Sequence, residues 1–535
     1  MKKFNLIAML AMVSVFIFSS CEEETAEPNN LVTIEGIPAT AEIENLGTVG
    51  PVSATVTAQD GISSIVVTKD GDTFLEPEFT AEATTATFEF SYTATEADAD
   101  QNIVFEFTAT DADGDTESVT HVLSVGAAPQ QLPNQVLSGL IEEDLTLTND
   151  RIWELAGRVI VTAGNTLTIQ PGTVIKGRPG DAAAASVLII ARGADIQANG
   201  TAEAPIVFTS TADEIRVGEF ESSLDLTTQR GLWGGVLILG NAPISAEADE
   251  AQIEGIPTTV TEGLYGGDDA ADNSGVFEYV SIRFTGAELG PGNELQGLTL
   301  GGVGSGTTIN HVESINSSDD GVEIFGGTVN ITNFIVWAQD DDGYDTDQGW
   351  SGTIDNFVYI GADEANGYAW DGDHGMELDG SEGDDGSANL VGKFINGSLR
   401  GLSSSDYADL RDGAKYDIQN TYFFDFAEGS DIEIDADDND DDPRGSDNYA
   451  NDITVFSGLE FNTTNVIGDI FVDKLDAAAA AAANDRTEAE FAAQITANGE
   501  KFVSNNSVVT EATVGADVSV LSWSYAAAQG QLDNF

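Results

Sequence analysis

Cysteine, histidine and basic residues are all scarce in this sequence. One cysteine in 535 residues means that no disulfide can form within the chain, and it excludes a cysteine-based metal cluster. Three histidines leave few candidates for a nucleophilic triad, and no glycine-rich phosphate loop ending in lysine is present. The 19 Lys and Arg residues stand against 92 Asp and Glu residues. The formal net charge of -73 therefore makes nucleic acids and anionic lipid headgroups poor partners.

This acidity is combined with the apolar content of a folded protein. Hydrophobic residues make up 41% and aromatic residues 8% of the chain, which is normal for a globular protein and argues against disorder. We therefore expect the carboxylates to cover a folded surface, where salt or divalent cations would screen them. The length allows two or three domains, each large enough to bury a core.

The N-terminus has the layout of a secretory signal. Residues 1–20 consist of the basic start MKK, an apolar run over residues 4–18 and two serines, and the run is too short to span a bilayer. Cys21 follows directly, and this arrangement resembles a bacterial lipobox. The resemblance implies a lipid-anchored protein of the outer membrane, exposed at the cell surface, with Cys21 as the lipidation site and the membrane as a partner. The alternative is a secreted protein in which the cysteine is coincidental.

Residues 21–31 are predicted to be a tether, and residues 32–126 a β-sandwich. Apolar and polar residues alternate through the second segment, as in TATFEFSYT and NIVFEFTATD, with frequent turns between such runs. This spacing predicts about seven strands and resembles the immunoglobulin-like or cadherin-like modules of bacterial surface proteins. We expect residues 127–147 to be a linker, and such a module to act as a spacer.

Residues 148–470 contain an internal repeat. Related segments occur as TINHVESI, NITNFIVW, TIDNFVYI and DIQNTYFF, which begin at residues 308, 330, 353 and 417. The first three begin 22 and 23 residues apart, which is about one turn of a right-handed parallel β-helix and about half the length of a β-propeller repeat. We therefore predict a parallel β-helix whose stacked coils bury a common core. Two columns run through the repeats, one of inward isoleucines and one of asparagines: Ile309, Ile331, Ile354 and Ile418, and Asn333, Asn356 and Asn420.

The C-terminal part differs in composition. Residues 471–502 are rich in alanine, with Glu and Lys on one face, and predict a helix that caps the final coils. Residues 503–535 are predicted to return to strands that complete the β-helix domain. The whole chain is thus expected to be all-β, with one short helical segment near the C-terminus.

The stretch QDDDGYDTDQGW at residues 339–350 carries five aspartates. Its DDG motif has counterparts along the repeat, so that Gly321, Gly343, Gly375 and Gly413 can be aligned. Acidic residues then occupy the same positions in successive coils, about 4.8 Å apart. The residues directly before each glycine are Asp320, Asp342, His374 and Asp412. The residues two places before it are Asp319, Asp341, Asp373 and Arg411. The residues two places after it are Glu323, Asp345, Glu377 and Lys415.

Carboxylates stacked so closely raise one another's proton affinity or require a cation. Three arrangements satisfy them: a Ca²⁺ site with hard oxygen ligands, a carboxylate pair that shares a proton, or solvated turns that splay outward. For Ca²⁺, the candidate ligands on this ladder are Asp320, Glu323, Asp341, Asp342, Asp345 and Glu377. The run at residues 431–448 offers a second set, Asp435, Asp437, Asn439 and Asp441, although a disordered acidic loop would show the same composition. Arg411 and Lys415 are predicted to compensate the charge at the end of the ladder.

Aromatic residues surround the ladder. If exposed, they could stack on sugar rings, and if buried, they belong to the core. The candidates for stacking are Tyr344, Trp350, Tyr368 and Trp370. Acidic oxygens next to aromatic planes are what a Ca²⁺-assisted glycan-binding face requires.

Two motifs of the ladder resemble the pectin-cleaving hydrolases with a β-helix fold. DDGVEI at residues 319–324 is similar to their paired-aspartate motif, and DHGMEL at residues 373–378 to their Gly-His-Gly motif. The resemblance implies Asp319, Asp320 and Asp345 as acid and base candidates and His374 as an auxiliary residue, with carboxylates about 5 Å apart in a retaining enzyme. The Arg-x-Lys substrate clamp of those enzymes is missing, and a lyase would depend on Arg411 as its base.

The repeated DDG blocks, DGDHGMELDG and the terminal SWSYAAAQG together resemble a family of β-helix surface lipoproteins common in Bacteroidota, over residues 135–535. The resemblance implies the fold and the location and leaves the activity open. Our leading hypothesis is a non-enzymatic binding or adhesion protein for an extracellular glycan or macromolecule, assisted by Ca²⁺, with an outer-membrane transporter as a further candidate partner. The alternatives are a polysaccharide lyase or glycoside hydrolase, and a structural protein of the envelope.

Overall fold

The computed structural model divides into two compact units, Met1–Gln130 and Gln131–Phe535. It describes residues 32–43, 47–126, 131–180, 185–246, 248–287, 295–381, 390–402, 406–434 and 443–535. The predicted signal, the tether and Cys21 lie outside the described residues, and so do the second candidate ligands Asp435, Asp437, Asn439 and Asp441.

The N-terminal unit is a β-sandwich, as the alternating pattern predicts. Its strands form a three-stranded sheet in the order β1-β3-β6 and a five-stranded sheet in the order β2-β8-β7-β4-β5. Residues from both sheets share one core, which includes Phe90 from β6 and Phe105 from β7. The described elements are β1 (Thr33–Glu35), β2 (Thr40–Ile43), β3 (Thr48–Thr57), β4 (Ile62–Lys69), β5 (Asp72–Leu75), β6 (Thr85–Thr93), η1 (Glu96–Asp98), β7 (Asn102–Asp111) and β8 (Thr116–Val125). The unit thus has eight described strands, one more than the sequence suggested.

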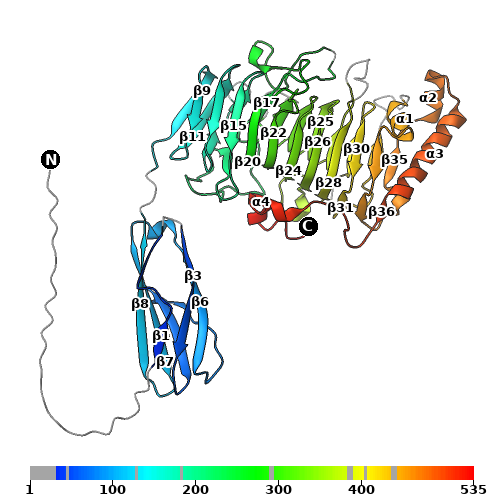
Figure 1. Cartoon of the computed structure of the whole chain (residues 1–535). Helices are drawn as coiled ribbons and strands as arrows, with labels where there is room; N and C mark the ends of the chain where they lie inside the picture. Colours follow the sequence, from blue (N-terminus) through cyan, green and yellow to red (C-terminus); the bar gives the residue numbers. More distant parts are fainter. Residues whose placement is uncertain are drawn as a thin grey trace, which may run out of the picture. The chain divides into compact units, whose positions relative to one another are not determined.

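The second unit is a parallel β-helix, in which 26 strands join into one sheet that winds along the axis (Figure 1). Its strands are β9 (Gln135–Ile141), β10 (Leu145–Leu147), β11 (Ile152–Val161), β12 (Thr166–Ile169), β13 (Val174–Gly177), β14 (Val187–Ile190), β15 (Asp195–Asn199), β16 (Ile206–Ser210), β17 (Gly235–Leu239), β20 (Gly275–Arg283), β21 (Leu298–Gly301), β22 (Thr308–Ile315), β23 (Val322–Phe325), β24 (Asn330–Trp337), β25 (Tyr344–Gln348), β26 (Thr353–Ile360), β27 (Met376–Leu378), β28 (Gly392–Arg400), β29 (Ala408–Leu410), β30 (Tyr416–Gln419), β31 (Tyr422–Phe424), β32 (Ile432–Ile434), β33 (Val455–Ser457), β34 (Glu460–Asn462), β35 (Phe471–Asp473) and β36 (Ser507–Val508). A small side hairpin pairs β18 (Ala251–Gln252) with β19 (Leu264–Tyr265), next to the single-turn helix η3 (Thr261–Gly263). The remaining single turns are η4 (Glu364–Asn366), η5 (Ile467–Asp469) and η6 (Val518–Leu521).

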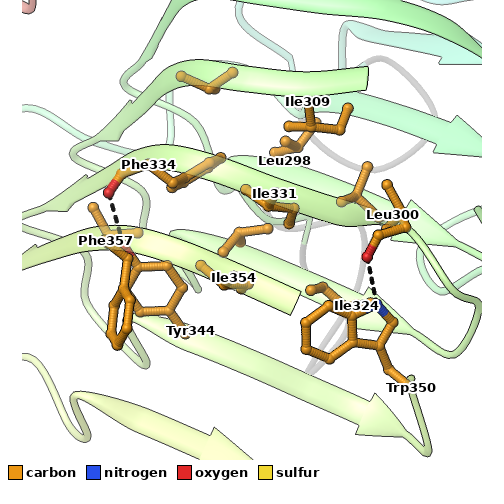
Figure 2. Packing of buried hydrophobic residues seen from close by; sticks show 14 of the residues in the cluster. Leu298, Leu300, Ile309, Ile324, Ile331, Phe334, Tyr344, Trp350, Ile354 and Phe357 are labelled. Carbon is orange, nitrogen blue, oxygen red and sulfur yellow. Dashed lines mark hydrogen bonds between the residues drawn. The ribbon is translucent and has the colours of Figure 1, made fainter. Parts of the chain in front are cut away.

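The predicted isoleucine column is confirmed by the strand register. Ile309 of β22 lies opposite Ile331 of β24, which lies opposite Ile354 of β26. The next member is Phe394 of β28, which connects Ile354 to Ile418 of β30. Figure 2 shows the three isoleucines at successive levels of the interior. The sequence pattern missed Phe394 because a long insertion delays that coil and a phenylalanine replaces the isoleucine.

The asparagine column marks a bend in each coil. Asn333, Asn356, Asn396 and Asn420 have φ values between 50° and 59°, a left-handed backbone that asparagine tolerates better than most residues. The amide of Asn356 donates to Asn333 Oδ1 at 2.7 Å, so the side chains also link one coil to the next. His311 has the same backbone conformation in the preceding coil. The prediction is confirmed, with Asn396 and His311 as additional members.

The β-helix begins within the predicted linker. Strands β9 and β10 precede residue 148, and β9 pairs in parallel with β11, for example Trp153 with Gln135. The sequence signal is weak here because the first coil has a neighbour on one side only. Val136 and Leu140 are accordingly 45% and 49% exposed.

The C-terminal end of the core is closed by helices. The predicted single helix over residues 471–502 is in fact β35, α2 (Ala477–Ala483) and α3 (Glu488–Asn505), with α1 (Arg444–Ala450) beside them. The alanine run forms α2 and ends at Asn484, and Thr487 and Glu490 form a capping box that starts α3. Phe502 of α3 stacks on Phe471 with ring centroids 5.0 Å apart. The predicted capping role therefore fits, and none of the helices in the described ranges is long and apolar enough to cross a membrane.

The predicted C-terminal strands are largely wrong. Residues 503–535 contribute only the end of α3, β36, η6 and the short helix α4 (Tyr525–Ala528) among the described elements. This segment returns along the β-helix (Figure 1), and its Leu521, Tyr525 and Leu532 share an apolar cluster with Trp337. The cluster also contains apolar strand residues whose side chains point away from the interior of the coils. These side chains are shielded from water only if another part of the chain packs on them. An extra coil could not provide that cover, because a coil stacks along the axis.

Candidate metal centre on the acidic face

The acidic ladder exists and runs across consecutive strands. Glu323 of β23 lies opposite Asp345 of β25, and Asp345 lies opposite Glu377 of β27. Ahead of these strands, the Gly321 amide donates to the carbonyl of Asp342, and the Gly343 amide to that of His374, each at 3.0 Å. The first three copies of the alignment are therefore in register, as the sequence predicts.

The fourth copy of the alignment is wrong. Asp409 of β29, not Lys415, lies opposite Glu377, and Asp406, not Asp412, forms a bridge with His374. The error arises because this coil has Tyr407 where the others have the aligned glycine. Lys415 lies in a different place, beside Trp350 at a small cavity.

The glycines of the DDG motifs are required by close packing between coils. A Cβ atom on Gly321 would lie 2.2 Å from Val336 Cγ1, and one on Gly343 would lie 2.5 Å from both Tyr359 and the carbonyl oxygen of Gly375. Any side chain at these positions would force the coils apart. The acidic residues on either side of each glycine are therefore held at a fixed spacing.

Together the columns line a cleft of about 410 Å³. Eight carboxylates, one amide and one guanidinium surround it: Glu254, Asp319, Asp320, Glu323, Asp341, Asp342, Asp345 and Glu377, with Gln296 and Arg411. Three groups have ligand atoms within 4.8 Å of one another: Asp319, Asp320 and Asp341; Asp320, Glu323 and Asp345; and Asp342, His374 and Glu377. All six candidate ligands of the ladder thus converge on one cleft.

The inner carboxylates are strongly perturbed. Burial, followed by the charges of neighbouring carboxylates, raises the pKa values of Asp320, Glu323 and Asp345 well above the ordinary range. Asp320 and Glu323 are only 5% and 4% exposed. Asp341 lies at the rim and is exposed, yet partial burial and the adjacent Asp342 raise its pKa to about 6. These groups resist ionisation in the absence of a cation.

Some of the buried oxygens also lack hydrogen-bond donors. Among the described residues, Glu323 Oε2 and Asp345 Oδ1 are buried without a hydrogen-bond partner. The Asp345 side chain does hydrogen-bond Glu323, so the two carboxyl groups lie in direct contact. A buried acceptor without a donor is unfavourable by about 1–3 kcal/mol, and more when the group is charged.

His374 neutralises one part of the ladder. Its Nδ1 lies 2.9 Å from Asp342 Oδ1 and 3.6 Å from Glu377 Oε2. Burial alone would lower the pKa of His374, but the hydrogen bond and charge of Asp342 outweigh it and raise the pKa to about 9. His374 is therefore a cation at neutral pH and is held in place by Asp342.

Arg411 neutralises the neighbouring part. Its guanidinium forms an ion pair with Glu377, and its Nε and Nη2 donate to the two oxygens of Asp379 at 3.0 and 3.2 Å. The predicted role as a charge-compensating residue is supported, although the register places Arg411 beyond Asp409 and not beside Asp373. The guanidinium is thus engaged as a hydrogen-bond donor to two carboxylates, which argues against the role of a lyase base.

The predicted sugar-stacking residues are largely wrong. Tyr344, Trp350 and Trp370 are 1%, 0% and 4% exposed. Figure 2 shows Tyr344 and Trp350 inside the coil, where the Tyr344 hydroxyl donates to Val358 O at 2.9 Å and Trp350 Nε1 to Val329 O at 3.0 Å. Half-buried Tyr368 accepts a hydrogen bond from Trp337. Tyr344 turns away from the cleft because alternate side chains of a strand point in opposite directions. Trp350, Tyr368 and Trp370 follow β25 or η4 and do not line the cleft.

The cleft also contains residues that sequence reasoning missed. Gln296 precedes β21, where its amide donates to Asp319 Oδ2 at 3.0 Å and its carbonyl accepts from Thr299 at 2.8 Å. Glu254 reaches the cleft from the loop after β18. Gln296 occupies the position of Asp320 in the preceding coil, which a longer alignment of the repeats could have revealed. Glu254 has no such signal, because it lies outside the repeat.

Comparison with known families identifies the family of most of the second unit. The family model for the pectate-lyase-like β-helix domain matches residues 139–507, more than half of the chain. A search of curated proteins and a search of solved structures each returned no match. The family agrees with the parallel coils described above and does not specify a substrate or an activity. The chain therefore belongs to the family of pectate-lyase-like β-helix domains.

Proposed function

We propose that this protein is a non-enzymatic binding or adhesion module that holds Ca²⁺ in the acidic cleft and uses it to bind an extracellular glycan or macromolecule. The supporting observation is the pair Glu323 and Asp345, whose buried oxygens have neither a basic partner nor a complete set of hydrogen bonds among the described residues. A cation in the cleft would satisfy these oxygens and lower the repulsion among the carboxylates.

The donor set favours Ca²⁺ over softer metals. The groups around Asp320 contain carboxylate oxygens only, and Ca²⁺ takes six to eight oxygen ligands in a flexible arrangement. The third group contains His374, but hydrogen bonding to Asp342 already engages that side chain. An ion held by carboxylates on one wall of an open cleft keeps further positions for water or ligand oxygens. Sugar hydroxyl and carboxylate groups could occupy those positions. Glycan binding would then rest on metal coordination and not on the predicted stacking against aromatic residues, which are buried.

Calorimetry in Ca²⁺ and in a chelator tests this proposal. In the folded state the cleft carboxyls hold protons that the unfolded chain releases above a pH of about 4. Without metal, the stability of the folded state therefore falls as the pH rises. For Asp341 this loss extends to a pH of about 6, and for the buried carboxyls it extends to higher pH. In EDTA, we expect a higher melting temperature at pH 5 than at pH 8. Saturating Ca²⁺ should raise it by about 5 °C or more at pH 8, and by less at pH 5 because protons compete. An identical melting temperature in Ca²⁺ and EDTA at pH 8 would contradict the metal site.

Display at the cell surface is the second part of the proposal. The support is the sequence of residues 1–21, in which an apolar signal precedes the single cysteine. We expect Cys21→Ala to move the protein from the membrane fraction to the soluble fraction, whereas Cys21→Ala protein that still sediments with membranes would argue against the lipid anchor. Co-purification of an outer-membrane transporter with the wild-type protein is the matching test for that partner.

A glycoside hydrolase is the second candidate function. The specific observation is that the carboxyl oxygens of Asp320, Glu323 and Asp345 lie within 4.8 Å of one another and have raised pKa values, since a retaining glycosidase needs a protonated acid close to a carboxylate. Release of reducing ends from a panel of glycans, lost in Asp345→Asn, would establish this activity in place of simple binding.

A further inference from the structure

Asp320 belongs to two of the carboxylate groups at once. One group joins it to Asp319 and Asp341, and the other joins it to Glu323 and Asp345. In the strand register, Asp345 lies opposite Glu323, and Asp341 precedes the next DDG glycine as Asp319 precedes the first. Asp320 is therefore shared by two groups, each of which contains residues from two adjacent coils.

From this sharing we infer that the cleft holds two divalent cations, bridged by the carboxylate of Asp320. The inner ion would lie among Asp320, Glu323 and Asp345, and the outer ion among Asp319, Asp320 and Asp341. This inference rests on the proposed cation binding and specifies its stoichiometry and its central residue.

The charge of the site supports two ions. When ionised, Asp320, Glu323 and Asp345 alone carry three negative charges, so one divalent ion would leave one of them uncompensated. Among the described residues, Asp320, Glu323 and Asp345 form no ion pair with a basic side chain, since His374 and Arg411 are engaged with Asp342, Glu377 and Asp379. Carboxylates with such little solvent access need compensation nearby.

The unsatisfied oxygens locate the inner ion. Glu323 is 4% exposed, lines the cleft and has its Oε2 buried without a hydrogen-bond partner in the described part of the chain. Asp345 Oδ1 is in the same condition. Glu323 and Asp345 both belong to the group that contains Asp320. Buried oxygens without protein donors are expected among the ligands of a metal site.

Asp320 has the capacity to bridge. Its Oδ1 accepts a hydrogen bond from the Asp342 amide at 3.0 Å, which fixes the orientation of the carboxylate. A carboxylate has about four lone-pair sites, so sites for both ions remain after this hydrogen bond. The two ions would differ in access, because Asp320 and Glu323 of the inner group are buried whereas Asp341 is exposed at the rim. The outer ion is then the one that an external ligand reaches.

Counting bound Ca²⁺ on the full chain tests the inference, by equilibrium dialysis followed by elemental analysis. We expect Asp320→Asn to bind two ions fewer than the wild type, Glu323→Gln one fewer, and Asp319→Asn one fewer. Glu203→Gln, which neutralises an exposed carboxylate elsewhere on the β-helix, should bind as many as the wild type. The differences between variants exclude ions bound outside the cleft.

Each other outcome has a defined meaning. If Asp320→Asn loses only one ion, as Glu323→Gln and Asp319→Asn do, the bridge is overturned and cation binding stands. If none of the three variants loses an ion, both the bridge and the proposed site are overturned. Asparagine at position 320 can still accept the Asp342 amide, and Glu323→Gln and Asp319→Asn give an independent count should that variant misfold.

Discussion

Replacement of Asp320 by asparagine is expected to stabilise the calcium-free protein and to abolish most of its response to calcium. Asp320 is 5% exposed, and its pKa is raised by burial and by Asp319, Asp345 and Asp342. A neutral amide removes this repulsion and keeps the acceptor for the Asp342 amide. We expect a higher free energy of unfolding in EDTA at pH 8, because the raised pKa of Asp320 makes its ionisation in the folded protein unfavourable at that pH. The melting temperature in EDTA should rise by a few degrees, while added Ca²⁺ should change it little.

Most substitutions at buried positions destabilise, so an increase in stability would be a specific sign of relieved charge repulsion. Glu203→Gln is the matched control, because it also removes one negative charge but lies exposed and outside the cleft. It should leave both the EDTA value and the Ca²⁺ response unchanged. A lower melting temperature for Asp320→Asn in EDTA would show that the carboxylate already has a favourable partner in the metal-free protein.

Replacement of Glu313 by alanine is expected to destabilise the β-helix by about 3–5 kcal/mol. Glu313 is completely buried, and its two oxygens accept the amides of Tyr525 and Ala526 at 2.9 and 3.1 Å. The buried guanidinium of Arg283 lies 3.9 Å from the ring centre of Tyr525, and the negative charge of Glu313 stabilises its charged form. Alanine would leave a buried cation without its counterion and would free the C-terminal segment from the coils.

Tryptophan fluorescence during urea denaturation measures this effect selectively. All six tryptophans lie in the β-helix unit, so the signal does not report on the sandwich. The double variant Arg283→Met with Glu313→Leu should recover much of the loss, because an apolar pair of similar size removes the unpaired charge. Glu221→Gln, at an exposed contact of the same segment with Gln529, should cost less than about 1 kcal/mol. A loss below that value for Glu313→Ala would mean that the buried pair does not hold the C-terminal segment in place.

Much of the fold could be read from local repetition. The spacing of TINHVESI, NITNFIVW and TIDNFVYI fixes which residues stack, because each coil pairs with the next through the same backbone register. The asparagine column follows from the same spacing and from the left-handed bend that asparagine tolerates. Prediction failed where a coil departs from the repeat, as in β29, where Tyr407 replaces the aligned glycine and the fourth set of acidic positions was misplaced.

The candidate site was predictable as a set of residues but not as a charge distribution. The DDG motifs identified Asp319, Asp320, Glu323, Asp341 and Asp345, and these do converge in one cleft. Which carboxylates are compensated depends on Arg411, whose side chain reaches back to Glu377 and Asp379 from another coil. No spacing rule gives that contact, because it depends on the length of the intervening loop.

The sequence by itself therefore determined the all-β class, the coil repeat and the acidic columns, since these arise from short-range patterns that every coil repeats. The tertiary structure alone decided that Tyr344, Trp350 and Trp370 are buried, that the C-terminal segment covers the coils through Glu313, and that Asp320 belongs to two groups of carboxylates. These features depend on side-chain direction and on contacts between residues up to 213 positions apart. Burial and charge compensation are properties of such contacts, and for that reason they emerge only once the chain has folded.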